Sequence, residues 1–150
     1  MDAADPVLTS AVEGTARRMP SSRMHVLIVE NHDDTRYLLG VLLEQLGHTV
    51  HAAANLGDAV AAAQGEDFDL LISDIGLPDG SGWELLERLG DRAPPYAIAM
   101  SGFGMASDRQ KSLAAGFRHH LVKPVEPNQL DALIEEAAGV VGRRKGVAPN

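Results

Sequence analysis

The chain has 150 residues, the size of a single domain with one sizeable core. Its formal net charge is -8, and the acidic excess lies in residues 24–138, because the charges of 1–23 balance and the charged residues of 139–150 are all basic. This distribution argues against nucleic acid as a partner. Cysteine is absent, which excludes disulfides, thiolate metal sites and a cysteine nucleophile.

No apolar run approaches the length that spans a membrane, and the first residues lack the basic-then-apolar order of a signal peptide. We therefore expect a cytoplasmic protein with no membrane partner. Residues 1–23 are small, polar and interrupted by prolines, so we expect a flexible N-terminal extension. A folded domain is predicted for 24–141 and a basic flexible tail for 142–150.

From residue 24 onward, apolar runs of strand length alternate with segments of helical periodicity. In chain order, the predicted elements are a strand at 25–30, a helix at 35–47, a strand at 49–53, a helix at 55–65, a strand at 69–73, a helix at 81–90, a strand at 96–100, a helix at 107–116, a strand at 119–122 and a helix at 126–141. Asp34, Asn55 and Ser81 are the predicted N-caps of the first three helices, and Pro127 fits the first turn of the last. This alternation predicts an α/β fold with a parallel sheet covered on both faces.

Polar and charged residues follow the strands of this predicted sheet. In an open α/β sheet, functional sites gather just beyond the carboxyl ends of the strands. The residues predicted at those ends are Glu30, Asn31, Asp74, Ser101, Gly102, Lys123 and Pro124. We therefore expect carboxylates, a hydroxyl and a lysine from four strands to converge on one edge.

Three of these residues suit phosphoryl transfer. A carboxylate oxygen of Asp74 can accept a phosphoryl group as an acyl phosphate, so Asp74 is the candidate nucleophile. Lys123 supplies a positive charge for one phosphoryl oxygen, and Ser101 supplies a hydroxyl donor for another. Each residue alone has an ordinary structural interpretation, such as a turn, a cap or a surface lysine. The functional interpretation depends on their conjunction.

A hard cation fits the same edge of the sheet. Glu30 and Asn31 are candidate oxygen ligands for Mg²⁺, and Asp74 supplies a further oxygen. The carbonyl of Gly76 adds a backbone ligand where the loop bends. A zinc site at His119 and His120 is not expected, because adjacent residues of a strand point to opposite faces.

The motifs "VLIVEN", "DLLISDIGLPDGSG", "AMSGFG" and "HHLVKPV" together resemble the response-regulator receiver domains of two-component signalling, in the order and spacing of that family. The resemblance covers about residues 24–141. The segments "DIGLPDGSGWEL" and "GFRHHLVKPV" are most similar to the receivers of hybrid sensor histidine kinases. Because no kinase module is present in the sequence, we expect a free-standing receiver.

The resemblance implies a flavodoxin-like (βα)5 three-layer sandwich with a sheet of order 2-1-3-4-5. It implies Mg²⁺ dependence and phosphorylation of Asp74 by a histidine kinase or a histidine phosphotransfer protein. The output is expected to pass through protein contacts or phosphate relay, and the oligomeric state is left open, with a homodimer among the options. A cis bond between Lys123 and Pro124 is also implied.

Two residues depart from the pattern of the family. Its acidic pair is usually two carboxylates, whereas here Asn31 follows Glu30, so we expect weaker Mg²⁺ binding or a changed rate of phosphorylation. His120 stands where the family often has Tyr or Phe, whose ring rotates as the hydroxyl residue, here Ser101, moves toward the phosphate. We expect Ser101 and His120 to form the switch, with pH sensitivity from the histidine.

The interpretation we favour is a phosphoacceptor that assists its own phosphoryl transfer and dephosphorylation but is not an enzyme. Three alternative functions remain open. The first is a degenerate receiver that binds partners without phosphorylation, supported only by Asn31. The second is an aspartyl-nucleophile phosphatase, which needs an Asp two residues after the nucleophile, where this chain has Gly76. The third is a flavin or nucleotide binder, which needs a Gly-rich loop where "ENHDDT" is acidic.

Overall fold

The described residues, 23–102 and 106–144 of this computed structural model, contain one five-stranded parallel sheet. Its strands are β1 (His25–Val29), β2 (Thr49–Ala53), β3 (Leu70–Asp74), β6 (Tyr96–Ser101) and β7 (His119–Val122). Their order across the sheet is β2-β1-β3-β6-β7. This is the predicted order 2-1-3-4-5, counted over the strands of the sheet, and the prediction is confirmed.

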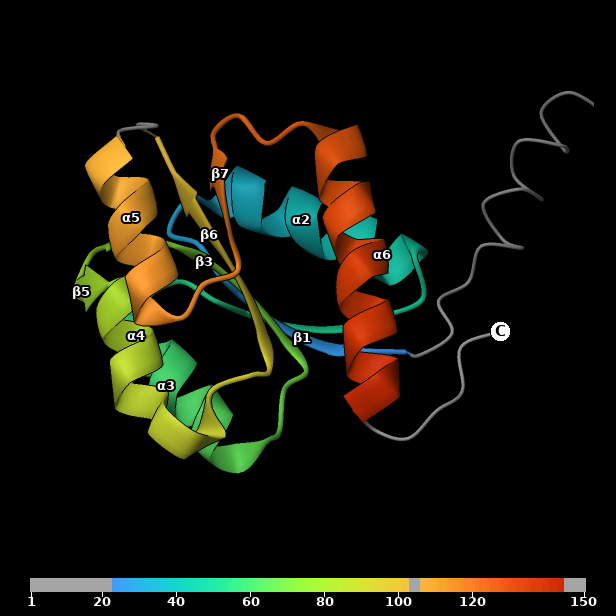
Figure 1. The fold of residues 1–150 in the computed structure, drawn as a ribbon, viewed down its shortest axis with the longest axis horizontal. Helices are drawn as coiled ribbons and strands as arrows, with labels where there is room; N and C mark the ends of the chain where they lie inside the picture. Colours follow the sequence, from blue (N-terminus) through green and yellow to red (C-terminus); the bar gives the residue numbers. More distant parts are fainter. Residues whose placement is uncertain (1–22, 103–105, 145–150) are drawn as a thin grey trace, which may run out of the picture.

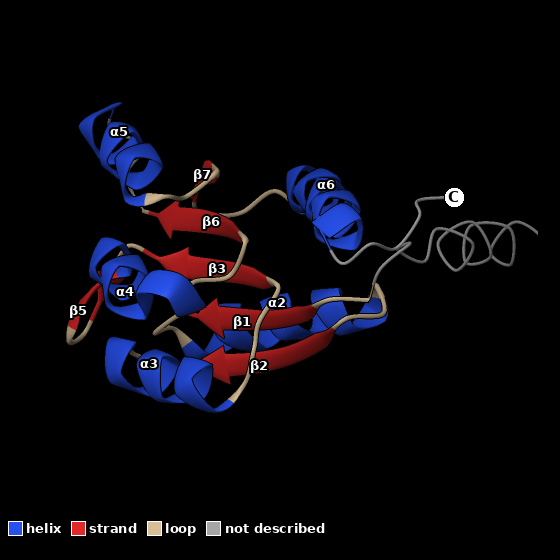
Figure 2. Ribbon diagram, turned by 60° about the horizontal axis from the view of Figure 1, so that its bottom comes forward, coloured by secondary structure: helices blue, strands red, loops and turns tan. Residues whose placement is uncertain are grey.

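Helices cover both faces of the sheet. They are α2 (Asp33–Gln45), α3 (Leu56–Gly65), α4 (Gly82–Leu89), α5 (Ala106–Ala115) and α6 (Pro127–Arg144), with a short 3-10 turn, η1 (Gly90–Arg92), after α4. Helices α2 and α6 lie on one face, and α3, α4 and α5 lie on the other (Figure 1). Figure 2 shows the sheet between these two layers. The predicted flavodoxin-like three-layer sandwich is confirmed.

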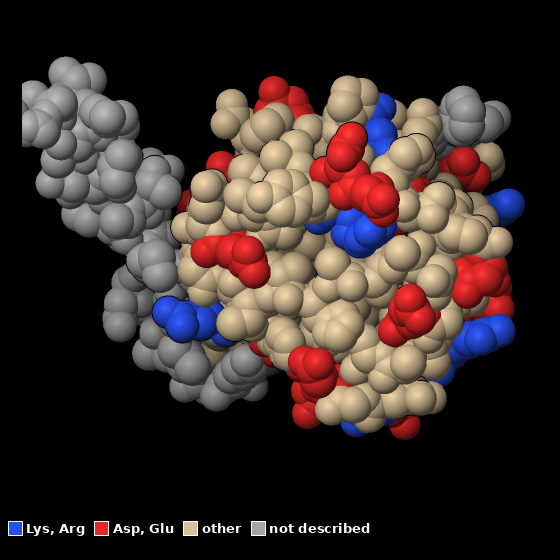
Figure 3. Space-filling model, turned by 180° about the vertical axis from the view of Figure 1, so that it is seen from behind, with Lys and Arg blue, Asp and Glu red and all other residues tan. Residues whose placement is uncertain are grey.

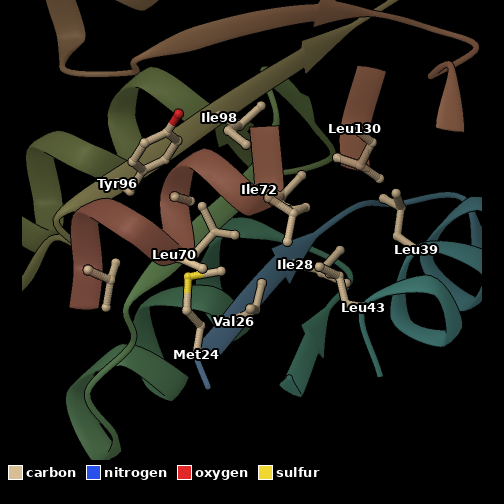
Figure 4. Close-up of a cluster of buried hydrophobic side chains, with 14 of the residues drawn as sticks. Met24, Val26, Ile28, Leu39, Leu43, Leu70, Ile72, Tyr96, Ile98 and Leu130 are labelled. Atoms are coloured by element: carbon tan, nitrogen blue, oxygen red, sulfur yellow. The ribbon is translucent and has the colours of Figure 1, made fainter. Parts of the chain in front are cut away.

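The two faces of the sheet build two hydrophobic cores because side chains alternate along each strand. In β1, Val26 and Ile28 pack toward α2 and α6 (Figure 4), whereas Leu27 and Val29 pack toward α3, α4 and α5. All four side chains are wholly buried. Burial of a side chain of this size contributes about 1.5–3 kcal/mol, so the central strands anchor the edge that bears the polar residues.

Two of the predicted helix caps are confirmed and one is wrong. The side chain of Asn55 accepts the N–H of Asp58 at 2.7 Å, and the hydroxyl of Ser81 accepts the N–H of Glu84 at 3.0 Å. Asp34 does not cap the first helix, because α2 begins at Asp33, two residues before the predicted start, and Asp34 is exposed in its first turn.

The early start of α2 follows from a hydrogen bond between its N-cap residue and the buried carboxylate at the end of β1. The N–H of His32, the N-cap residue, donates to Oε2 of Glu30 at 2.9 Å, while the His32 side chain makes no capping bond. Asp34 remains favourable in the first turn, where the helix dipole attracts negative charge.

The Gly/Pro loop after β3 contains a small hairpin that the sequence did not predict. Its strands are β4 (Gly76–Leu77) and β5 (Gly80–Ser81). The carboxylate of Asp79, between them, accepts the N–H of Leu56 at 2.7 Å and that of Gly57 at 2.9 Å. These backbone hydrogen bonds lower the pKa of Asp79 and fasten the loop to the start of α3.

The predictions for the ends of the chain fall mostly outside the described residues. Residues 1–22 and 145–150 are not described, whereas α6 continues to Arg144, past the predicted end of the domain at 141. Among the described helices, none is both long enough and apolar enough to span a membrane.

The buried ring of His48 predicts a pH-dependent stability. Its Nδ1 accepts the N–H of Met24 at 3.0 Å, and burial, assisted by the charge of Arg23 and opposed by Asp69, lowers the pKa of His48 below its usual 6.5. Because the unfolded chain takes up the proton first, the free energy of unfolding will fall as the pH drops below 6.5.

Urea unfolding at about pH 7.5 and about pH 5.5 measures this loss. In His48→Gln, the amide oxygen can accept the same N–H but does not titrate, so the loss between the two pH values will be smaller than in the wild type. An equal loss in both proteins would contradict this role of His48.

Candidate functional site

Three charged side chains meet at the carboxyl edge of the sheet. Glu30 follows β1, Asp74 ends β3 and Lys123 follows β7. The Nζ atom of Lys123 lies 2.5 Å from Oδ2 of Asp74 and 2.6 Å from Oε1 of Glu30. The side chain of Lys123 thus joins two carboxylates that come from other strands.

These groups are buried more deeply than charged side chains usually are. Glu30 is wholly buried, and the side chains of Asp74 and Lys123 are only 13% and 20% exposed. Backbone groups complete part of the site, since Oδ1 of Asp74 accepts the N–H of Gly76 at 3.1 Å. The charges remain tolerable because each faces an opposite charge or a polar hydrogen.

Lys123 is the positive counterpart of both acids. Burial by itself would lower the pKa of its ammonium group, but hydrogen bonds and charge interactions with Asp74 and Glu30 outweigh burial and raise the pKa above the usual 10.5. Lys123 therefore stays charged at neutral pH.

Close backbone packing holds the end of β3 in place. The N–H of Ile75 donates to the carbonyl of Met100 at 2.8 Å, and the N–H of Gly82 donates to the carbonyl of Ile75 at 3.0 Å. A Cβ atom on Gly82 would lie 2.6 Å from the Asp74 carbonyl oxygen, so only glycine allows α4 to start this close to the site.

The lysine is fixed in a comparable way. The N–H of Lys123 donates to the carbonyl of Ser101 at 2.7 Å, which ties the end of β7 to the end of β6. The peptide bond between Lys123 and Pro124 is cis, as the family resemblance implied.

Asn31 and Gly76, the other predicted cation ligands, lie at the open side of the site and are exposed. The Asn31 side chain makes no hydrogen bond within the described parts of the chain, while its backbone carbonyl accepts a bond from Arg36 at 3.2 Å. Gly76 contributes its N–H to Asp74, which leaves its carbonyl oxygen as the candidate ligand.

The oxygens of this edge fit a hard cation. Oε1 of Glu30 is buried, and it lies 2.6 Å from the ammonium group of Lys123. No cluster of three or more His, Asp or Glu in metal-binding positions occurs among the described residues. A cation here would therefore be held by two carboxylates together with neutral oxygens, which is a donor set that Mg²⁺ accepts.

The hydroxyl of Ser101 contacts His120. Its Oγ lies 2.7 Å from Nε2 of His120, and the other ring nitrogen of His120 lies 2.8 Å from Oγ of Ser112 on α5. The indole N–H of Trp83 on α4 donates to the same Ser112 oxygen at 3.0 Å. The hydroxyl of Ser101 is therefore engaged with β7 and α5.

Neither Ser112 nor the Trp83 N–H is predicted from sequence as part of a site. The Trp83 side chain is partly buried and packs against the core that α3, α4 and α5 share with the sheet. The position of Ser112, a polar residue on the buried side of α5, is the feature of the sequence that could have indicated this contact. The two histidines point apart as expected, with His120 toward Ser112 and His119 toward Glu136 on α6, 2.9 Å away.

The fold and this edge of acids and lysine define a receiver-type α/β domain. The family model for the response regulator receiver domain matches residues 26–135. The chain belongs to this family, whose members are the phosphoacceptors of two-component signalling and generally bind Mg²⁺ at the site of phosphorylation.

Curated relatives share this domain in different contexts. The chain is 36% identical to a 14.6 kDa protein of the sodA1 3' region in Leptolyngbya boryana, over 77% of this chain and 90% of the relative. It is 34% identical to the response regulator PilR of Pseudomonas aeruginosa and 32% identical to the histidine kinase BarA of Escherichia coli, over 77% and 74% of this chain. It spans only 26% of PilR and 12% of BarA.

Solved structures agree with the fold. A CheY-like receiver from Methanospirillum hungatei matches with a TM-score of 0.76 and 31% identity, over 82% of this chain and 99% of that one. The receiver of Ssk1 from Saccharomyces cerevisiae, solved with the histidine phosphotransfer protein Ypd1, matches with a TM-score of 0.73 and 25% identity, over 81% and 92%.

Replacement of Lys123 tests the charge balance of the site. Lys123→Met leaves two buried carboxylates without their counter-charge, so we expect the free energy of unfolding in the absence of divalent cations to fall by about 3 kcal/mol. Urea unfolding in chelator measures the loss, and added Mg²⁺ will stabilise the variant more than it stabilises the wild type.

Lys111→Met is the matched control, because it removes an exposed lysine whose Nζ lies 5.2 Å from the Trp83 ring centroid. We expect that change to cost less than about 1 kcal/mol. Similar stabilities for the Lys123 variant and the wild type would show that the acids do not depend on the lysine.

Proposed function

We propose that this protein accepts a phosphoryl group on Asp74 from a phosphohistidine of a histidine kinase or a histidine phosphotransfer protein, with Mg²⁺. The observation that carries the proposal is the position of Lys123, whose ammonium group bridges Asp74 and the buried Glu30 at the carboxyl edge of the sheet. Phosphoryl transfer to a carboxylate needs positive charge beside it, and the ammonium group of Lys123 fits that need.

The transfer step balances on the residues of the site. An Asp74 oxygen attacks the phosphorus, the P–O bond of an acyl phosphate forms, and the P–N bond to the donor imidazole breaks. The imidazole keeps the electron pair of that bond and takes its proton from the solvent. Lys123 stabilises one phosphoryl oxygen, and the same geometry lets the chain assist its own later dephosphorylation. When bound, Mg²⁺ neutralises charge between the acids and the phosphoryl group.

The residues assigned to the cation are Glu30, Asp74, the amide oxygen of Asn31 and the carbonyl of Gly76. The burial of Glu30 supports this assignment, because a buried carboxylate favours cationic partners. Ser101 is proposed to donate to a phosphoryl oxygen and to form the switch together with His120.

The surface of α2 supports a protein as the phosphodonor. Tyr37 and Leu38 are 74% and 58% exposed on α2. Leu38, Leu42 and Pro124 line an apolar groove that Lys123 also lines, so apolar surface adjoins the site. An apolar patch beside a reactive group is typical of a protein docking surface, and the Ssk1 receiver was solved with a phosphotransfer protein.

The output is proposed to be a protein contact. On the face shown in Figure 3, the described acidic and basic side chains are scattered among uncharged ones and form no broad basic surface. The relative from Leptolyngbya boryana, of which the chain covers 90%, supports a receiver that works as a separate protein.

Intact mass after incubation with a small phosphodonor tests the proposal. We expect the wild type to gain one phosphoryl group in the presence of Mg²⁺, and we expect no gain in chelator. Asp74→Asn will gain none, because an amide oxygen is a poor nucleophile for this transfer. Asp79→Asn is the matched control, since Asp79 caps α3 outside the site. Equal labelling of Asp74→Asn and the wild type would contradict the assignment.

Asn31 favours a second candidate, a degenerate receiver that binds partners without phosphorylation. It supplies a neutral oxygen where the family usually has a carboxylate, and the described residues offer the cation no third carboxylate. We expect Asn31→Asp to strengthen Mg²⁺ binding by about tenfold, because a unit charge close to a dication is worth about 1 kcal/mol or more.

Titration of the phosphorylation level against Mg²⁺ concentration measures that change. Asn55→Asp, at the N-cap of α3, is the matched control and will leave the titration unchanged. If the wild type takes up no phosphoryl group and Asn31→Asp restores uptake, the second candidate is favoured. If both proteins are labelled at the same Mg²⁺ concentration, Asn31 is not a ligand.

A further inference from the structure

Strand β2 lies at one edge of the sheet and leaves one of its sides open. Among the described strands it pairs only with β1, in parallel, and Figure 2 shows it as the outermost strand. Its sequence, "TVHAA", contains no Lys, Asp, Glu or Pro, and its pairing with β1 continues without a bulge. Exposed edges are usually protected by such features. The open side of β2 can therefore accept another strand.

Two residues in the middle of β2 direct their backbone groups toward this open side. The N–H of Thr49 donates inward, to the carbonyl of Met24 at 3.0 Å, and the carbonyl of Ala53 accepts the N–H of the residue that follows β1, also at 3.0 Å. The backbone groups of successive residues in a strand point to opposite sides. Those of Val50 and Ala52 therefore point away from β1, and no described strand pairs with them.

The spacing of these outward groups is self-complementary. When a second copy of β2 lies antiparallel beside the first, the N–H and the carbonyl of Val50 meet those of Ala52 in the other copy. A two-fold axis supplies the reverse pairing, and it passes between the two copies of His51. This register satisfies the outward backbone groups in the middle of both strands without a bulge.

Helix α2 and β2 form a groove along the same edge. The groove has a volume of about 330 Å³, and Tyr37, Gly40, Val50 and Ala52 are among the residues that line it. A Cβ atom on Gly40 would lie 4.0 Å from Cγ1 of Val50, so the middle of α2 passes close to the two-fold axis. The Tyr37 side chain is 74% exposed in the single chain, and a second copy at this edge would cover it.

Charged residues of α2 favour a second copy over an unrelated strand. Arg36 and Glu44 line the same groove, one turn before and one turn after Gly40. Two α2 helices related by the axis run antiparallel, so Arg36 of each copy faces Glu44 of the other. Glu44 is exposed and has no ion pair within the described parts of the chain. Arg36 binds Asp33 at 2.6 Å, and its guanidinium has enough donors for a second carboxylate, so the two surfaces are complementary in charge.

We propose that a second copy of this chain binds along β2, so that the sheets of the two copies join into one. This inference goes beyond the proposed phosphoryl transfer and does not depend on it. The antiparallel strands direct the acid-and-lysine edges of the two copies in opposite directions, so neither edge is covered. Leu38 lines the separate groove beside Lys123 and stays exposed for a phosphodonor.

Amide hydrogen exchange, followed by NMR on the full chain, tests the contact residue by residue. In dilute protein, the N–H groups of Val50 and Ala52 face solvent and will exchange rapidly. Their exchange will slow about tenfold when about nine-tenths of the chains are paired, because only the unpaired chains exchange. The N–H groups of Thr49 and His51 point to β1 and are the internal controls, which will exchange slowly throughout. Rapid exchange of Val50 and Ala52 up to millimolar protein would overturn the proposal.

Analytical ultracentrifugation of the full chain measures the association itself. We expect the mean mass to rise with concentration from that of one chain to that of two. A chain that stays monomeric up to millimolar concentration would overturn the proposal and leave the edge of β2 to a strand of another protein.

Ala52→Pro places the dimer contact at β2. It removes the outward N–H but keeps the bonds to β1, because an edge strand tolerates proline where its N–H faces solvent. The dissociation constant of the dimer will rise at least about tenfold, since the two-fold axis removes the same hydrogen bond twice. An unchanged dissociation constant would show that the copies meet elsewhere and would overturn the proposal.

Glu44→Arg provides a second variant in case Ala52→Pro does not fold. It sets an arginine beside Arg36 of the other copy, and we expect the repulsion to raise the dissociation constant by about tenfold. Glu87→Arg, at an exposed position of α4, is the matched control with the same net charge. Equal dissociation constants for these two variants would overturn the arrangement of the helices about the axis.

The pairing of β2 and the phosphoryl transfer fail separately. Hydrogen exchange and sedimentation need no phosphodonor. If the wild type gains a phosphoryl group but remains a monomer, only the pairing is overturned. If it dimerises through β2 but gains no phosphoryl group, only the proposed function is overturned.

Discussion

The ammonium group of Lys123, held between Asp74 and Glu30, is the interaction on which the rest of the site depends. Glu30 is wholly buried at the end of a central strand, where an isolated carboxylate would be strongly disfavoured. The lysine relieves this cost only if β1, β3 and β7 end at the same edge, in register. The hydrophobic cores on both faces of the sheet fix that register, so the packing of uncharged side chains determines where the charges meet.

The same interaction explains why Asn31 matters. Two carboxylates and one ammonium group leave the site with a single excess negative charge, and a carboxylate in place of Asn31 would add another. The phosphoryl group proposed for Asp74 would carry nearly two negative charges in place of the single charge of the carboxylate. A site with one acid fewer repels that group less strongly, but it also attracts a divalent cation less strongly. The exposure of Asn31 limits the effect, because solvent screens a charge at the rim more than one at the position of Glu30.

The alternation of elements was predictable from sequence because apolar runs and glycine or proline breaks mark each strand and helix locally. The strand ends that carry Glu30, Asp74 and Lys123 followed from that alternation. Features set by contacts between distant segments were not predictable. The start of α2 depends on a bond from the His32 N–H to a buried carboxylate, and the hairpin after β3 depends on Asp79 reaching the start of α3. No local pattern encodes either contact.

His120 changes how a switch at Ser101 can work. A phenyl ring in its place would be held by packing alone, and it could rotate wherever space allowed. The imidazole is bonded at both nitrogens, to Ser101 and to Ser112, and these bonds are directional. Rotation of the ring would break two buried hydrogen bonds, each of which is costly to leave unmade. If Ser101 acts as the proposed switch, a change there would pass more readily through the hydrogen bonds that join His120, Ser112 and Trp83 than through rotation of the ring.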